Sequence, residues 1–443
     1  MTTPQHCDLI ISAHTLINLE ASEENSHVDC MAIHQGNIIG IDSRNNIQKQ
    51  WQSSNTLHLP NHIICPGLIN AHGHSAMSLL RGFADDMPLM QWLEEKIWPT
   101  EAAFVDEAFV YDGTQLAIAE MIRSGTTTFS DMYFFPESAA QAIDECAMRA
   151  QLSFPVFDFP SNWGTGPENY LRLGEALIQQ YKNNALINII PGPHAPYTVG
   201  DEALQSAHAL AQKYHCGLQM HLHETAFEVD TAIQETGQRP LQRLHDLGLL
   251  NKHFQAVHMT CLNEQDIALC KSSGLSIIHC PESNLKLASG FCPTHTLHEA
   301  GINVALGSDG AASNNDLDLF GEMRTASLLS KAVSGVSTSM NAQASLSMAT
   351  INGAKALGIE AVTGSLTVGK AADFIAIDTK ELEQQPLYSA LSTLTYSNIS
   401  PRVSHSFVNG VCLMKDYQFT QASNLDIDNI IYKAKSWQKK IKP

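Results

Sequence analysis

Two histidines, His72 and His74, stand two residues apart at the end of the short apolar run 67–71. Side chains at positions i and i+2 of an extended backbone point to the same side, so both imidazoles can face one point. Imidazole nitrogens are common ligands of zinc and related divalent cations. A His-x-His pair alone is weak evidence for a metal, because surface and core histidines are more common. Its meaning depends on the polar residues that follow later in the chain.

Five later apolar runs also end in polar side chains that can bind metals or move protons. These side chains are His194, His221 with His223 and Glu224, His258, His279 and Asp309. Taken singly, each has a simpler explanation; Asp309, for example, could cap the following helix. Burying this many polar groups together would be costly without a metal ion. Their recurrence therefore predicts a metal site.

The ligand types indicate which metal and which chemistry. Nitrogen and oxygen ligands without thiolates favour zinc, with iron, manganese and nickel as alternatives. Three histidines and one aspartate would leave one position open for water, and zinc lowers the pKa of such a water to about 7. Glu224 is the carboxylate that we expect to move its protons. The spacing leaves either His221 or His223 as the ligand, and we expect a bend at the strand end to bring Glu224 round.

The elements that must position these residues alternate between strands and helices. Strands are expected at 67–71, 126–131, 153–159, 186–191, 218–222, 255–258, 275–279 and 303–306. The clearest helical segments are 109–124, 137–150, 168–181, 202–214, 264–271 and 322–331. Helix caps in the left-handed conformation are expected at Gly125, Gly217, Gly274 and Gly301.

This alternation predicts an α/β fold built around a (β/α)8 barrel of the TIM type. The polar residues then fall at the C-terminal ends of the strands, where barrel enzymes carry their chemistry. An open doubly wound sheet is the alternative. No Gly-x-Gly-x-x-Gly motif opens a helix after the first strand, which weakens that alternative.

Both ends of the chain have β character. Residues 8–62 are expected to form strands without a helix, with a hairpin at Gln35-Gly36. Further strands are expected at 364–366, 373–378 and 406–411, with a second hairpin at Asn409-Gly410. The predicted domains are a small β-sandwich from residues 1–64 and 364–420, a barrel at 65–363, and a tail at 421–443 with a helix over 427–442.

Composition limits the partners. The chain has 443 residues, with 26 basic and 45 acidic side chains and a formal net charge of −19, which disfavours nucleic acid or an anionic membrane as a partner. Its ten cysteines include no Cys-x-x-Cys pair. We find no signal peptide and no apolar run of about 20 residues, the length of a membrane span. We therefore expect a cytoplasmic protein with reduced cysteines.

The motifs resemble those of the amidohydrolase superfamily, and within it the methylthioadenosine/S-adenosylhomocysteine deaminase family, which is also similar to s-triazine hydrolases. The resemblance covers nearly the whole chain and is carried by the segments 66–74, 192–197, 221–225, 281–287 and 307–315. It implies one divalent cation per subunit, because two-metal relatives carry a lysine where this chain has His194. It also implies a homo-oligomer, for which the helix faces give no indication of their own.

The resemblance also implies roles for the polar residues. The family pattern His-x-x-Glu makes His221 a metal ligand beside His72, His74 and Asp309, and makes Glu224 the proton shuttle. His258 matches a family histidine that contacts the reacting water or the tetrahedral centre. Asp309 would also orient the water and help to protonate the departing amine.

Four residues match positions that bind substrate in the family. One is Glu224, which would contact ring nitrogen N1 when it passes the proton. Glu101 matches a glutamate that binds ribose hydroxyls, and His194 resembles the residue that hydrogen-bonds the purine. Trp92, in an expected lid at 85–99, would form a wall for the base or the sulfur substituent, although ordinary helix packing also explains it. Relatives that accept a homocysteine tail carry arginines after the third strand. This chain has no arginine there until Arg172, which favours the uncharged methylthio substrate.

The implied reaction is hydrolytic deamination of a small-molecule adenine nucleoside to its inosine analogue and ammonia. The substrate expected first is 5'-methylthioadenosine, then S-adenosylhomocysteine or adenosine. One alternative is an aminohydrolase or chlorohydrolase that acts on an s-triazine, guanine or cytosine. Another is a non-catalytic scaffold, which would be expected to lose metal ligands that this chain retains.

Overall fold

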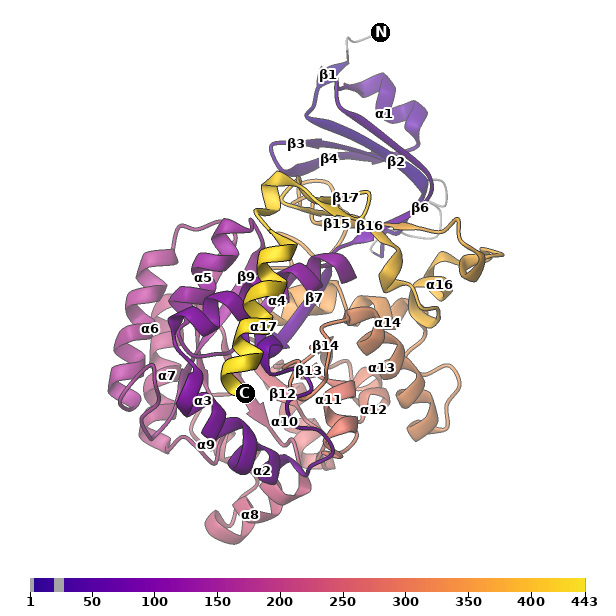
Figure 1. The fold of residues 1–443 in the computed structure, drawn as a ribbon. Coiled ribbons are helices and arrows are strands. Elements are labelled where there is room, and N and C mark those ends of the chain that lie inside the picture. Colours follow the sequence, from indigo (N-terminus) through magenta and orange to yellow (C-terminus); the bar gives the residue numbers. More distant parts are fainter. Residues whose placement is uncertain (1–3, 20–27, 443) are drawn as a thin grey trace.

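The computed structural model describes residues 4–19 and 28–442 of the chain. Its centre is a barrel of eight parallel strands, made of two four-stranded sheets with the orders β10-β9-β8-β7 and β11-β12-β13-β14. The strands are β7 (Leu68–Gly73), β8 (Thr126–Asp131), β9 (Arg149–Val156), β10 (Ile187–Pro193), β11 (Leu218–Leu222), β12 (Phe254–His258), β13 (Ser276–His279) and β14 (Asn303–Leu306). The predicted barrel fold is confirmed (Figure 1).

Two seams close the barrel. At one seam the backbone N–H of His221 donates to the carbonyl of His194 at 3.0 Å, which joins β10 to β11. At the other, the N–H of Asp309 donates to the carbonyl of His72 at 3.1 Å, beside a parallel bridge between Gly73 and Asp309. Residues expected in the metal site therefore lie at both seams.

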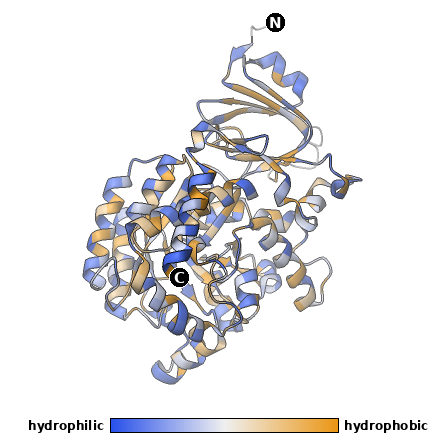
Figure 2. Cartoon of the chain, viewed as in Figure 1, coloured by the Kyte–Doolittle hydropathy of each residue, from blue (hydrophilic) through white to orange (hydrophobic). Residues whose placement is uncertain are grey.

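Helices cover the outside of the barrel (Figure 1). Between the strands lie α4 (Glu107–Ser124), α5 (Pro136–Glu145), α6 (Pro167–Tyr181), α7 (Asp201–Tyr214), α8 (Ala226–Thr236), α9 (Pro240–Asp246), α10 (Glu264–Ser273), α11 (Pro281–Lys286) and α12 (Thr294–Glu299). After β14 come α13 (Leu319–Ser334), α14 (Ala342–Met348) and α15 (Ile351–Ala356). Figure 2 shows the apolar residues concentrated on the strands and the inner helix faces.

Two local predictions in the barrel are wrong. The helix expected at 137–150 ends at Glu145, and β9 already begins at Arg149. Gly217 is not a left-handed helix cap, because His215 ends α7 with a φ of 52°. Gly217 instead lies against β12, where a Cβ atom would be 2.8 Å from Nε2 of Gln255. Gly125, Gly274 and Gly301 have the predicted positive φ.

The small domain is one mixed sheet of eight strands from both ends of the chain, in the order β18-β17-β16-β15-β6-β2-β3-β4. Its strands are β2 (Leu9–Leu16), β3 (Cys30–His34), β4 (Asn37–Asp42), β6 (Thr56–Pro66), β15 (Phe374–Asp378), β16 (Val403–Val408), β17 (Val411–Lys415) and β18 (Gln418–Phe419). A separate pair consists of β1 (Gln5–His6) and β5 (Trp51–Gln52). The antiparallel pairing of β6 with β15 joins the N-terminal and C-terminal strands.

Both predicted hairpins are present, because Gln35-Gly36 and Asn409-Gly410 each have two successive positive φ angles. The expectation that residues 8–62 contain no helix is wrong, since α1 (Arg44–Gln50) lies between β4 and β5. Ile47 is the buried residue of α1, so that segment has no apolar period to recognise. No strand forms at 364–366 within the described chain.

Buried polar contacts attach the sheet to the barrel. The guanidinium of Arg149 on β9 pairs with Asp373, just before β15, at 2.8 Å. The backbone N–H of Asn409 donates to the same carboxylate at 2.6 Å. Gly67 joins β6 directly to β7 and lies so close to Thr127 that no side chain would fit. The sheet is therefore fixed to the strand that carries His72.

The remaining helices lie at the barrel mouth and along the chain's C-terminal part. After β7 come η2 (Ser75–Leu80), α2 (Leu89–Trp92), the π-helical turn η3 (Leu93–Ile97) and α3 (Trp98–Phe104). Later elements are η4 (Leu382–Gln384), α16 (Ala390–Tyr396), η5 (Ser400–Arg402), η6 (Gln421–Ser423) and α17 (Ile427–Ile441). The predicted helix at the chain's end packs on α4, where Trp437 donates to Asp112 at 2.9 Å. No helix in the described part of the chain is long and apolar enough to cross a bilayer.

Candidate active site

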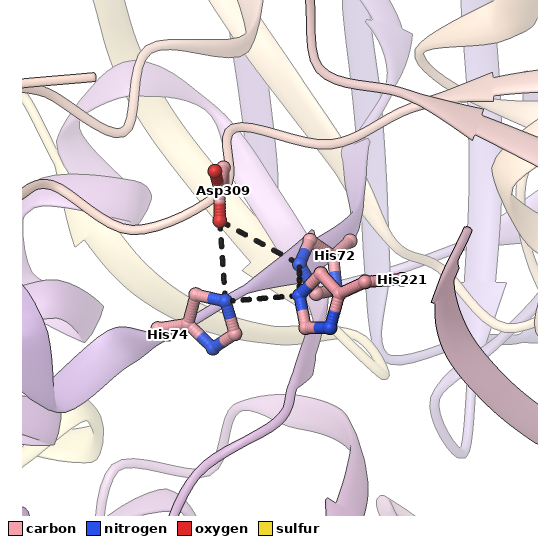
Figure 3. Close-up of side chains that lie close together, drawn as sticks. All are labelled: His72, His74, His221 and Asp309. Carbon is pink, nitrogen blue, oxygen red and sulfur yellow. Dashed lines mark hydrogen bonds and ion pairs between the residues drawn. The ribbon is translucent and has the colours of Figure 1, made fainter. Parts of the chain in front are cut away.

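Four side chains meet at the C-terminal ends of β7, β11 and β14. They are His72, His74, His221 and Asp309, whose possible ligand atoms all lie within 4.8 Å of one another. Nε2 of His221 is 3.2 Å from Nε2 of His72 and 3.4 Å from Nε2 of His74. Oδ1 of Asp309 is 3.2 Å from Nε2 of His74 and 3.6 Å from Nε2 of His72 (Figure 3).

Each of the three histidines has its other ring nitrogen against a fixed acceptor. Nδ1 of His72 lies 2.8 Å from the amide oxygen of Gln219. Nδ1 of His74 lies 2.6 Å from the Met132 carbonyl, and Nδ1 of His221 lies 2.8 Å from the His194 carbonyl. These contacts place the proton on Nδ1, so all three Nε2 lone pairs face the centre of the cluster.

The arrangement of these nitrogen atoms and of the Asp309 carboxylate shows whether a cation would fit between them. Three lone pairs and a carboxylate oxygen that face one another repel unless a positive charge lies between them. Burial lowers the pKa of His72 to about 4 and lowers the pKa of His221 well below its usual value, which keeps both rings neutral. At His74 burial is outweighed by the hydrogen bond to Asp309 and the charge of that carboxylate, which raise the pKa to about 9, so a bound cation would replace that proton. The four groups therefore fit a divalent cation with three nitrogen ligands and one oxygen ligand.

Asp309 is held by its neighbours with one oxygen free. Its φ of 59° is in the left-handed region, in the loop that follows β14. The hydroxyls of Ser283 and Ser313 donate to Oδ2 at 2.6 and 3.0 Å. Oδ1 is left to face the histidines, as one ligand of a cation requires.

A bend after β11 separates the two histidines that the sequence could not distinguish. His223 has a φ of 52°, so the strand does not continue past Leu222. Its ring turns into the protein, where Nδ1 lies 3.1 Å from the Cys261 carbonyl and Nε2 accepts the Leu241 N–H at 3.1 Å. The predicted bend is present, and it places Glu224 in the same cavity as His221.

This cavity has a volume of about 530 Å³ and contains nearly all of the predicted site residues. Its lining includes His74, Trp92, Glu101, His194, His221, Glu224, His258 and Asp309. His72 is fully buried beside them. A larger groove of about 1150 Å³ adjoins the cavity and shares Leu89, Tyr197 and Glu224 with it. That groove does not contain the histidine cluster, so the smaller cavity is the candidate site.

His279 does not join this site. It lines a different cavity of about 150 Å³ with Cys292 on the outer side of the barrel wall, against α12 and α13. Burial lowers the pKa of His279 to about 3, so the ring stays neutral. The other four strand ends with an imidazole each place one at the cavity of about 530 Å³, whereas His279 does not line it.

Glu224 and His258 face each other at the edge of the cluster, with Oε2 of Glu224 3.8 Å from Nε2 of His258. Burial raises the pKa of Glu224 to about 8, a value suited to a group that takes and returns a proton near neutrality. The side-chain amide of Asn284 donates to Nδ1 of His258 at 3.0 Å. The His258 proton is therefore on Nε2, the opposite tautomer from the three clustered histidines, and it can be donated into the cavity.

The aromatic wall of the cavity combines one carboxylate with aromatic rings. The hydroxyl of Tyr133 donates to Oε1 of Glu101 at 2.6 Å, and burial raises the pKa of Glu101 to about 7. The indole of Trp92 is fixed by a 3.0 Å hydrogen bond to the Ala84 carbonyl. Phe134 and Phe157 extend the same wall. This part of the cavity suits a flat, mostly apolar ligand with hydroxyl groups.

Sequence reasoning missed three supporting residues, namely Gln219, Asn284 and Tyr133. Gln219 could have been found, because it precedes His221 by two residues on β11 and so shares its face. It belongs to a buried polar layer in which its amide donates to Gln255 at 2.7 Å and Gln151 donates to Gln255 at 2.9 Å. The contacts of Asn284 and Tyr133 depend on chain segments that meet only in the fold.

Comparison with known proteins adds independent support. The model of the amidohydrolase family matches residues 63–413. A 5-methylthioadenosine/S-adenosylhomocysteine deaminase of Saccharophagus degradans is 51% identical over 441 residues, which cover 100% of this chain and 98% of the relative. A 5'-deoxyadenosine deaminase of Methanosarcina mazei is 38% identical over 414 residues, covering 93% of this chain and 94% of the relative.

A crystal structure of an adenosine deaminase from Xanthomonas campestris with bound zinc superposes with a TM-score of 0.97. It is 40% identical in sequence, and the match covers 99% of this chain and 100% of that one. Three observations point to one family: the barrel, the cluster of ligands at its mouth and these matches over most of the chain. The chain belongs to the amidohydrolase family.

Proposed function

We propose that the protein is a metal-dependent hydrolytic deaminase of adenine nucleosides whose 5' substituent carries no negative charge, with 5'-methylthioadenosine as the preferred substrate. The observation that carries the proposal is one cavity that contains a cluster of cation ligands, a glutamate with a raised pKa and a second carboxylate at the aromatic wall. The names of the relatives, which are deaminases of adenine nucleosides, support the same reaction.

His72, His74, His221 and Asp309 would hold the divalent ion, and zinc fits their three nitrogens and one oxygen best. When bound, the ion supplies Lewis-acid activation of a water molecule near neutral pH. The fixed Nδ1 contacts of the histidines orient the ligands before the ion arrives, so little reorganisation is needed.

Glu224 and His258 perform the proton chemistry. The water oxygen bonds to C6 of the adenine, while Glu224 takes one water proton and delivers it to ring nitrogen N1. Nε2–H of His258 donates to the tetrahedral centre as charge develops there. Asp309 orients the water and helps to direct its second proton to the amine, so the C6–N bond breaks and ammonia leaves. The two water protons thus end on N1 and on ammonia.

The aromatic wall and His194 recognise the rest of the nucleoside. Glu101 accepts hydrogen bonds from the ribose hydroxyls, with one of its oxygens already fixed by Tyr133. His194 hydrogen-bonds the purine, and Trp92 covers the base or the 5' substituent. The place of each residue in the cavity and the family pattern support these proposed roles.

The charges around the cavity favour a neutral 5' substituent. No lysine or arginine is among the described residues that line the cavity. Arg243 lines the adjoining groove, but its guanidinium is bound to Asp201 and to the Pro196 and Val199 carbonyls. A carboxylate on the substituent would therefore lose water without gaining a cationic partner.

The test is ammonia release from a panel of substrates by one metal-analysed sample. The panel contains 5'-methylthioadenosine, 5'-deoxyadenosine, adenosine, S-adenosylhomocysteine, guanine and an s-triazine. We expect kcat/KM for 5'-methylthioadenosine to exceed that for S-adenosylhomocysteine by about tenfold or more, which corresponds to about 1.4 kcal/mol. Faster turnover of guanine or the triazine would contradict the proposed substrate class.

A further inference from the structure

The bend that carries Glu224 into the site is clamped by a second glutamate, Glu228, in the first turn of α8. Oε1 of Glu228 accepts the backbone N–H of His223 at 2.9 Å, and Oε2 accepts the backbone N–H of Glu224 at 2.7 Å. One carboxylate therefore binds two consecutive amides at the point where β11 ends. Without it, both N–H groups would lack a partner in a partly buried position, which is costly.

We propose that Glu228 is a positioning residue for the reaction, acting through the backbone to hold the Glu224 carboxylate in its catalytic place. The inference rests on the proposed function, because it takes Glu224 to be the proton shuttle. Glu228 lines the adjoining groove and is not among the residues that line the catalytic cavity. Its effect on the reaction must therefore pass through residues 223 and 224.

The position of Glu228 is itself set by the start of α8. Thr225 is the N-cap, and its hydroxyl accepts the Glu228 N–H at 3.2 Å. In the usual capping box, the acid at the third helical position reaches back to the N-cap amide. Here it reaches further, to the two amides that precede the N-cap. The helix start thus fixes the bend as well as the helix.

The carbonyl side of the bend is fixed separately. The N–H of Thr260 donates to the His223 carbonyl at 3.0 Å, and the Thr260 hydroxyl donates to the Glu224 carbonyl at 2.7 Å. Amides bound by Glu228 and carbonyls bound by Thr260 hold the two residues from opposite sides. This holds a left-handed conformation at His223, which a residue with a Cβ adopts at a cost.

Loss of the clamp should affect the chemical step more than substrate binding. A shift of about 1 Å in a reacting group can lower turnover by about 100-fold. The ribose and purine contacts lie on other elements, so KM should change little. The histidine cluster depends on β7, on β14 and on His221 before the bend, so metal content should also change little.

The experiment compares Glu228→Gln, Glu228→Ala and Glu228→Asp with Glu202→Gln as the matched control. Glu202 is also in the first turn of a helix and lines the same groove, but it is exposed and contacts no site residue. Kinetics are measured on 5'-methylthioadenosine with folded, metal-analysed protein. We expect Glu228→Gln and Glu228→Ala to lower kcat about 10- to 100-fold, with KM within about twofold and one metal per chain retained. Glu228→Asp should recover part of the loss, and the control should match the unmodified protein.

Amide hydrogen exchange across residues 221–225 gives a second readout, and faster exchange in the Glu228 variants supports the clamp. Unchanged kcat, or a loss explained entirely by unfolding or missing metal, would overturn the inference. An unmodified protein that deaminates no adenine nucleoside would instead refute the proposed function. In that case amide hydrogen exchange alone would test the clamp. Unchanged protection of residues 221–225 in Glu228→Gln would refute the clamp too.

Discussion

The histidines of the site differ in which ring nitrogen carries the proton, and that difference separates their roles. His72, His74 and His221 have acceptors at Nδ1, so their Nε2 atoms can bind a cation. His258 has an amide donor at Nδ1, so its Nε2 carries a proton. Neighbouring polar groups thus decide which imidazoles bind a cation and which can donate a hydrogen bond.

Replacement of Glu224 by glutamine tests the proton shuttle at the scale of one residue. The amide keeps the shape of the carboxylate but cannot take a proton, so we expect kcat to fall about 10²- to 10⁴-fold. Metal content should stay at one ion per chain, because Glu224 is not in the ligand cluster. Steady-state kinetics and metal analysis on the same sample check this. Near-normal turnover would exclude the assigned role.

Replacement of Gln219 tests whether its contact with His72 contributes to metal binding. In Gln219→Leu the Nδ1 atom of His72 loses its acceptor, and we expect metal affinity to fall about 10- to 100-fold. Competition with a chromophoric chelator measures that affinity. Gln151→Leu is the control, since Gln151 belongs to the same buried layer but contacts none of the four clustered residues. Equal losses in the two variants would assign the effect to the layer as a whole.

The carboxyl of Glu101 should make KM, and so substrate binding, depend on pH. Burial raises the pKa of its carboxyl to about 7. The protonated fraction therefore grows as the pH falls from 8 to 6, and a protonated carboxyl accepts ribose hydroxyls less well. We expect KM for 5'-methylthioadenosine to rise over that interval in the unmodified protein and to stay flatter in Glu101→Gln. The same KM slope in both would show that another group titrates.

At the scale of elements, the sequence predicts those strands and turns that depend on neighbouring residues alone. Strands β8, β11 and β14 have the predicted bounds. Each is a short run of mostly apolar or β-branched residues, and β8 is the threonine-rich example. The hairpins at Gln35-Gly36 and Asn409-Gly410 followed from residues that accept positive φ. Helix α8 is missing from the prediction because Val229 is the residue that it buries, and α9 is missing because its seven residues are too few to show a helical period.

The bend after β11 marks the limit of such rules. A regular strand would place His221 and His223 on one face, and a bend was expected only because Glu224 had to reach the site. The bend is in fact held by Glu228, Thr260 and the Leu241 N–H, which come from three other segments. Contacts of that kind are set by the tertiary fold and cannot be seen in spacing.

At the scale of the whole molecule, two parts of the chain are joined by a buried ion pair between Arg149 of the barrel and Asp373 of the small sheet. Removing one partner of such a pair leaves an uncompensated buried charge. We expect Asp373→Ala to lower the free energy of unfolding by about 3–5 kcal/mol. Denaturant titration measures this, while kcat per folded molecule should stay unchanged.

The control is Glu383→Ala, which removes an exposed ion pair with Arg402. Surface pairs of that kind contribute about 0–1 kcal/mol. If Asp373→Ala were no more destabilising than Glu383→Ala, the small sheet would not depend on the buried pair for its attachment. A loss of kcat in properly folded Asp373→Ala would instead show that the sheet influences the site.

The central claim is that the four-residue cluster holds one divalent ion on which deamination depends. The most direct measurement is a zinc titration of metal-free protein while ammonia release from 5'-methylthioadenosine is followed. The account predicts no activity at zero metal and a rise that stops at one ion per chain. Activity that is independent of added metal, or that rises only as a second ion binds, would contradict it.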